Sequence, residues 1–161
     1  MNPIDHADLV RTVVERVVGE VSTKKMTLDL ALRLTEAVKK KASEMGVKAV
    51  VAVSDASARL ISMQCMDDSF IASKDIAAGK AYTSVALKMS TKELSALAAP
   101  GGSLYGIQFT NDGNIVIFGG GEVLRKKDGT ILGGLGVSGG TEEQDTALAA
   151  FGAEQFSHMI F

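Results

Sequence analysis

The chain has 161 residues, of which 17 are basic and 19 acidic, and its formal net charge is −2 at pH 7. This length fits one domain with a real core, and the near balance of charge gives no attraction for nucleic acid or an anionic membrane. A single cysteine, Cys65, excludes an internal disulfide framework and a four-cysteine zinc site, and two histidines, His6 and His158, are too few for a multi-histidine metal centre.

Residues 1–21 are predicted to form an amphipathic helix of their own. Asn2 offers a helix cap and Pro3 suits the first turn. Apolar side chains then recur at three- and four-residue spacing, at Leu9, Val10, Val13, Val14, Val17, Val18 and Val21. Residues 22–26 follow as a polar linker. The N-terminus lacks a signal-peptide pattern and no apolar run approaches the roughly 18 residues of a membrane span, so a cytoplasmic location is expected.

The middle of the chain is predicted to alternate between helices and one hairpin. The expected elements are a helix over 27–45, strands over 47–54 and 59–66, a helix over 74–88 and a short helix from residue 90. Gly46 ends the first of these helices, because glycine readily adopts the left-handed conformation of a helix terminus. Ser73 is expected to cap the second, and a capping box that begins at Ser90 opens the third.

The last third of the chain is predicted to complete an antiparallel sheet. Hairpin signals at residues 111–113 and 128–129 separate short β-branched runs. The expected strands are 106–110, 114–118 and 131–137, with residues 122–125 pairing across 127–130. A capping box at Thr141 opens the final helix. This order predicts an α+β domain over residues 27–161, with an antiparallel five-stranded sheet flanked by helices.

One glycine-rich segment imitates a nucleotide-binding motif. Residues 134–139 match the Gly-x-Gly-x-x-Gly spacing that binds dinucleotides. That motif works only inside a βαβ unit, with a second parallel strand that ends in an acidic residue about 20 residues on. The helix from Thr141 occupies the rest of the chain and leaves no room for this strand. An NAD site is therefore rejected.

Several separated blocks resemble one known family. The blocks are Val51-Ala52-Val53-Ser54-Asp55, Met66-Asp67-Asp68, Ser73-Lys74-Asp75-Ile76-Ala77, Lys80-Ala81, Pro100-Gly101, Ser103-Leu104-Tyr105-Gly106, Gly119-Gly120-Gly121 and Gly136-Val137-Ser138-Gly139-Gly140-Thr141, followed by Glu143-Gln144-Asp145. Their order resembles the GlcG/HbpS (haem-degrading-type) family, including the C-terminal domain of PduO-type proteins and the small DhaG/OrfY-type members of diol or glycerol dehydratase loci. The resemblance implies a profilin-like α+β fold, assembly from dimer to octamer and, in some members, haem binding.

The N-terminal helix lies outside this resemblance, and two interpretations of it stay open. It is similar to the encapsulation peptides that direct enzymes into bacterial microcompartments, where an amphipathic helix binds a groove on shell or cargo proteins. Alternatively, its apolar stripe docks on its own domain or on a neighbouring subunit, as amphipathic helices usually do.

Three groups of residues are candidates for binding a cofactor-like ligand. Ser73, Asp75 and Lys80 share one predicted helix, where the lysine could hold a carboxylate or propionate; a capped helix with a solvated lysine is the alternative. Gly119, Gly120 and Gly121 with Ser138, Gly139 and Gly140 could offer backbone N–H groups to an anion at a helix N-terminus, or form a bulge and a cap. Tyr105 could line the site or have a purely structural role.

Haem is the leading ligand hypothesis, and its iron needs an axial donor. The two histidines fall outside the family blocks, and Cys65 and Met66 are the other donors considered, with burial in the core as their alternative role. The resemblance implies an accessory protein that binds haem or a corrinoid-related ligand in diol, glycerol or propanediol metabolism. A haem-dependent redox or haem-degrading enzyme, and a structural partner of dehydratase, reactivase or shell proteins, are the alternatives.

Overall fold

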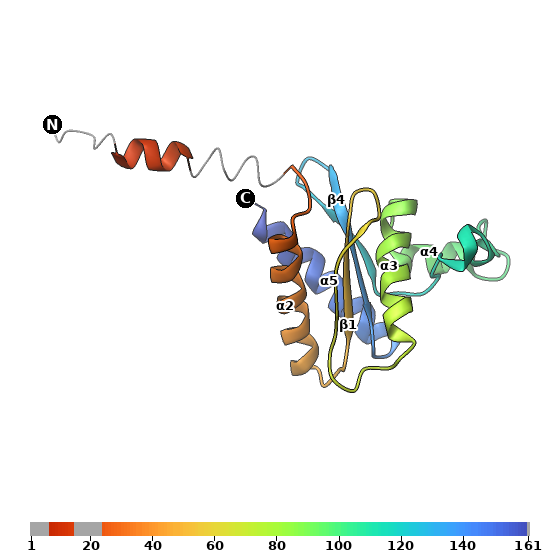
Figure 1. Ribbon diagram of the computed structural model, residues 1–161. Coiled ribbons are helices and arrows are strands. Elements are labelled where there is room, and N and C mark those ends of the chain that lie inside the picture. Colours follow the sequence, from red (N-terminus) through yellow and green to blue (C-terminus); the bar gives the residue numbers. More distant parts are fainter. Residues whose placement is uncertain (1–6, 15–23, 161) are drawn as a thin grey trace.

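The computed structural model describes residues 7–14 and 24–160, and its centre is a four-stranded sheet in the order β2-β1-β4-β3. The strands are β1 (Val50–Asp55), β2 (Leu60–Cys65), β3 (Gly121–Arg125) and β4 (Ile131–Ser138). Every neighbouring pair is antiparallel. The helices that follow the linker are α2 (Leu28–Glu44), α3 (Ser73–Leu87), α4 (Thr91–Ala98) and α5 (Glu142–Met159). Figure 1 shows α2 and α5 on one face of the sheet and α3 on the other.

The α+β class and the antiparallel sheet agree with the sequence analysis, but the expected five strands are wrong. Residues 106–110 form a single 3-10 turn, η1 (Ile107–Phe109), because Gly106 enters it with φ 89°. Residues 114–118 form no strand, and two of their backbone groups bond to a side chain of α3. The Val116 N–H donates to Thr83 Oγ1 at 3.0 Å, and that hydroxyl donates to the Asn114 carbonyl at 3.3 Å.

Most of the helix boundaries follow from local capping chemistry. Thr27 caps α2 through a bond from the Leu30 N–H, and complete capping boxes open α4 at Ser90 and α5 at Thr141. The prediction that Ser73 caps α3 is wrong. Ala72 holds the cap position without a side-chain bond, and the Ser73 hydroxyl instead meets the Ser138 hydroxyl at 3.0 Å.

The two faces of the sheet are filled in different ways. The face toward α2 and α5 carries the large apolar core, with Val51, Val53 and Leu135 fully buried. The face toward α3 is built from small residues, so the helix lies close to the strands. A Cβ on Gly136 would overlap the Ala77 carbonyl, and one on Gly134 would overlap the Ala81 carbonyl. The glycine spacing that imitates a nucleotide motif therefore serves the packing of α3 on β4.

The predicted N-terminal helix is seen in part. Residues 7–14 are helical, and Leu9, Val10, Val13 and Val14 are each at least half exposed. The rest of the predicted stripe and the first two residues of the linker lie outside the described residues. Within 7–14 and 24–160, no helix has the length and apolar character needed to cross a bilayer.

Candidate functional site

A buried ion pair joins α3 to α5 across the end of β4. The Lys80 Nζ lies 2.9 Å from Asp145 Oδ2, and the two side chains are 0% and 4% exposed. The same ammonium donates to the Val137 carbonyl at 2.8 Å. The Phe118 ring covers it, with the ring centroid 4.7 Å from the nitrogen. The lysine is thus fully enclosed by a carboxylate, a carbonyl and an aromatic face.

The electrostatics of Lys80 reflect this enclosure. Burial lowers the pKa of Lys80, because a charged amine loses its hydration inside the protein. The hydrogen bond that Lys80 donates to Asp145, and the negative charge of that carboxylate, raise the pKa of Lys80. Two directed hydrogen bonds to oxygen favour the ammonium form, so the structure shows a satisfied ion pair.

Carboxylates of α5 bind the backbone amides of the glycine segments. The Gly119 N–H donates to Glu142 Oε1 at 3.1 Å, and the Gly140 N–H donates to Asp145 Oδ1 at 2.9 Å. Glu142 also meets Lys92 at 3.0 Å, and the hydrogen bonds from Lys92 and Gly119 lower the pKa of its carboxyl. The N-terminus of α5 favours negative charge, and here that charge is supplied by the side chains of Glu142 and Asp145.

The structure brings most of the predicted site residues into this one network. Ser73, Lys80, the glycines 119–121 and residues 138–140 all lie around the ends of β4 and α5. Asp75 and Tyr105 lie elsewhere. Asp75 is on the exposed side of α3, and Tyr105 is 67% exposed on the loop after α4.

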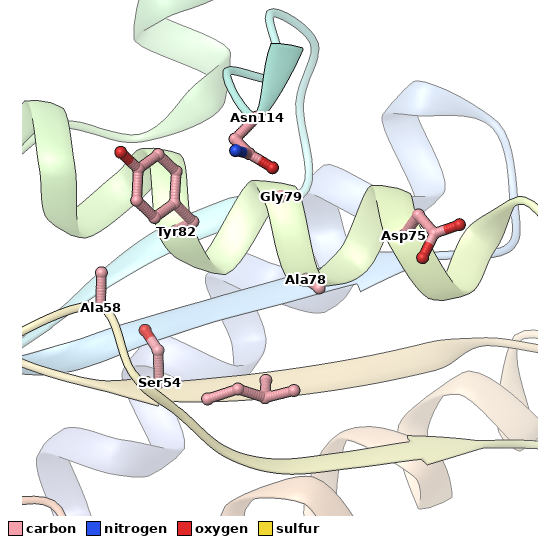
Figure 2. A pocket seen from close by; sticks show the side chains of 8 residues that line it. Ser54, Ala58, Asp75, Ala78, Gly79, Tyr82 and Asn114 are labelled. Atoms are coloured by element: carbon pink, nitrogen blue, oxygen red, sulfur yellow. The ribbon is translucent and has the colours of Figure 1, made fainter. Parts of the chain in front are cut away.

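An open cleft runs along the outer side of α3, and we call it the α3 cleft (Figure 2). Its volume is about 420 Å³, and its lining residues are Ser54, Ala58, Leu60, Asp75, Ala78, Gly79, Tyr82 and Asn114. In Figure 2, Ser54 and Ala58 rise from the β1–β2 hairpin on one side of α3, and Asn114 lies on its other side. The cleft thus joins a helix, a hairpin and the loop that precedes β3.

Polar groups in the α3 cleft come from the helix, from β1 and from the loop that precedes β3. The Tyr82 hydroxyl accepts a hydrogen bond from Asn111 Nδ2 at 3.2 Å. Asp75 contributes an exposed carboxylate, 3.7 Å from Lys74 Nζ. The Ser54 hydroxyl is buried and donates to the Ala81 carbonyl at 3.5 Å. A ligand here would meet one carboxylate, one phenol and a floor of small side chains.

The sequence analysis missed Tyr82 and Asn114 as cleft residues. A helical pattern could have found the tyrosine, because Asp75, Gly79 and Tyr82 are four and three residues apart and so share one face. Nothing local marks Asn114, which reaches the cleft through the unpredicted path of its loop. The donors considered for iron lie elsewhere. Cys65 is exposed at the end of β2, Met66 packs on the larger core and His158 is in the last turn of α5, while His6 is outside the described residues.

Comparisons with known proteins give consistent results. Residues 26–154 match the model of the family described as haem degrading protein HbpS-like. An uncharacterized 15.0 kDa protein from the dhaT-dhaS intergenic region of Citrobacter freundii is 44% identical over 134 residues, 83% of this chain and 94% of that relative. The corrinoid adenosyltransferase PduO of Citrobacter freundii is 35% identical over 88% of this chain, which spans only 44% of that relative. A crystal structure of a PduOC–haem complex superposes with a TM-score of 0.77 at 37% identity, covering 81% of this chain and 94% of that one.

Proposed function

The chain belongs to the HbpS-like family, and from this membership we propose that the protein binds haem or a corrinoid-related tetrapyrrole in the α3 cleft. The observation that carries the proposal is the similarity to a domain that forms a complex with haem. The proposed setting is diol or glycerol metabolism, where the protein is a cytoplasmic accessory factor that assembles as a homo-oligomer. The relative from the dhaT-dhaS region and the PduO relative support this setting.

The residues of the α3 cleft fit such a ligand. A volume of about 420 Å³ lies in the range of about 300–1,000 Å³ that small-molecule sites occupy. Haem iron accepts a tyrosine oxygen as axial ligand, and Tyr82 carries the phenol of the cleft. Asp75 would repel the propionates, so it favours an orientation that keeps them away from its end of α3. When bound, haem would supply redox-active iron to the site.

The proposed role is binding, and two other outcomes are distinguishable from it. Turnover of bound haem with a reductant and peroxide would indicate the haem-degrading enzyme. Absence of any ligand would leave the structural partner of dehydratase, reactivase or shell proteins. The chain spans less than half of PduO, so the adenosyltransferase activity of that relative is not carried over.

We propose a separate role for the N-terminal segment, that of directing the protein to a bacterial microcompartment. Residues 7–14 support it, because they form a helix with an exposed stripe of leucine and valine. An apolar helical face of this kind binds a groove on a partner protein.

The ligand proposal is tested by titrating the purified protein with haemin and, separately, with hydroxocobalamin, and following the visible absorbance. We expect a saturable haemin-induced Soret shift in the wild type that changes position in Tyr82→Phe, because the variant keeps the ring and loses the oxygen. Tyr105→Phe, on the exposed loop, is the matched control and should behave as wild type. His158→Ala and Cys65→Ala test the other donors. A featureless linear rise in absorbance would reject haem, and a shift lost only in His158→Ala or Cys65→Ala would reject the cleft.

A further inference from the structure

The two edges of the sheet differ in how they are protected. On the β3 edge, Glu122 and Arg125 are charged, and α4 covers the start of the strand through a bond from the Gly121 N–H to Thr91 Oγ1. Charges and covering elements prevent an edge from pairing with another chain. The β2 edge has the sequence Leu-Ile-Ser-Met-Gln-Cys, with no charge and no proline. Within the described residues its only strand partner is β1.

The register shows which backbone groups β2 presents at this edge. The Met66 N–H donates to the Ala49 carbonyl, so the pairs of Gln64 with Val51 and of Ser62 with Val53 are the hydrogen-bonded ones. In an antiparallel ladder the residues between them point their N–H and C=O groups the other way. Met63 and Cys65 therefore direct these groups outward, and the Cys65 residue is exposed.

We propose that β2 pairs antiparallel with β2 of a second copy of this chain, about a two-fold axis at Met63. In this register Met63 faces its own counterpart, so its outward-pointing groups in the two copies are paired. Cys65 faces the stretch around Ile61 of the other copy, where the β1–β2 register shifts. Two four-stranded sheets become one continuous sheet. Such an interface is isologous, because each copy offers the same strand.

Charge complementarity identifies a second copy as the occupant. Arg59 precedes β2 and Asp67 follows it, and they are equally far from Met63 in sequence. Antiparallel pairing therefore sets each Arg59 opposite Asp67 of the other copy. Both residues are exposed, with the arginine side chain 76% accessible and bonded to Asp55 of its own chain. The register shift near Ser54 displaces this end of the strand by one position, which the long arginine side chain can span.

The first test is sedimentation equilibrium of the full chain and its charge variants. We expect a wild-type dimer, and a dissociation constant raised at least about tenfold in Arg59→Glu and in Asp67→Lys, because like charges then face each other. The double variant Arg59→Glu/Asp67→Lys should restore the dimer to within about threefold, since the reversed pair attracts again. Arg33→Glu is the matched control, because Arg33 has the same i,i+4 carboxylate contact on α2. A monomeric wild type, or single variants that dimerise like the control, would overturn the proposal.

Hydrogen exchange tests the same pairing without relying on the charges. The amides of Met63 and Cys65 should exchange slowly at concentrations above the dissociation constant and quickly below it. The Gln64 amide bonds to β1 and should stay slow at both, which makes it an internal control. Rapid exchange at Met63 and Cys65 in the assembled protein would reject the β2 interface, even if a dimer forms by another surface. Neither experiment involves haem, so a result that rejects the β2 interface says nothing against the ligand proposal.

Discussion

Lys80 is a charged residue that lies fully buried and links three elements of the fold. A lysine without exposure is expensive, because an ammonium loses several kcal/mol of hydration inside a protein. Here the cost is offset by the Asp145 carboxylate and the Val137 carbonyl, which join α3, β4 and α5. Gly120 makes room for the pair, since a Cβ there would lie 2.7 Å from the lysine nitrogen and is disfavoured at φ 114°.

Asp145→Asn should destabilise the protein by about 3–5 kcal/mol, because it leaves a buried ammonium without its counter-charge. Urea unfolding followed by circular dichroism measures this loss. The double variant Lys80→Met/Asp145→Asn is the control, and it should lose less than the sum of the two single variants. Additive losses would show that the two side chains are not coupled.

At the scale of elements, the sequence predicts what depends on local chemistry. The capping boxes at Ser90 and Thr141 and the β1–β2 hairpin are visible from side-chain patterns. The strand predicted over residues 114–118 is wrong, because a β-branched apolar run predicts burial but does not say which groups form hydrogen bonds with its backbone. In this protein the partner is Thr83, distant in sequence.

Thr83→Val should cost about 1–3 kcal/mol, because an isosteric side chain leaves the Val116 N–H without its acceptor. Thermal unfolding of the variant would show the loss. Thr110→Val is a suitable comparison, since Thr110 is exposed and its hydroxyl donates to the Ile107 carbonyl of its own turn. We expect a change within about 0.5 kcal/mol there. Equal effects at both positions would refute the special role of Thr83.

The candidate site shows the same limit at the level of side chains. The sequence analysis named Ser73, Lys80 and the glycine segments as candidates for ligand binding, and the structure places them in one hydrogen-bond network. Their pairing with Asp145 and Glu142 could not be predicted, because it depends on how α5 packs against β4. The α3 cleft depends on the same long-range packing, since Asn114 enters it from a loop.

For the whole molecule, the main division is between the packed domain and the N-terminal segment. The core contains α2, α5 and the sheet from Met26 onward, and none of its buried members comes from residues 7–14. The apolar side chains of that helix are half exposed, so they contribute little to the stability of the domain that the structure describes.

Deletion of residues 1–21 should therefore leave the melting temperature within about 2 °C and the oligomeric state unchanged, if the segment serves targeting. Differential scanning calorimetry and light scattering on the full and shortened chains provide the comparison. If the stripe instead docks on its own domain or on a neighbouring subunit, the shortened chain should melt earlier or dissociate, which would contradict the targeting role.

The position of β4 has a consequence for how the protein is made. Of the four strands that the structure describes, β4 is the last to be synthesised, yet it lies between β1 and β3 in the sheet. Until Ser138 has left the ribosome, the edge of β1 that later pairs with β4 has no partner. The valine-rich β1 can then pair with a wrong strand. At about 5–20 residues per second this exposure lasts for seconds after the β1–β2 hairpin emerges. The order of synthesis therefore leaves an apolar strand edge without its native partner for longer than the strand order β2-β1-β4-β3 alone suggests.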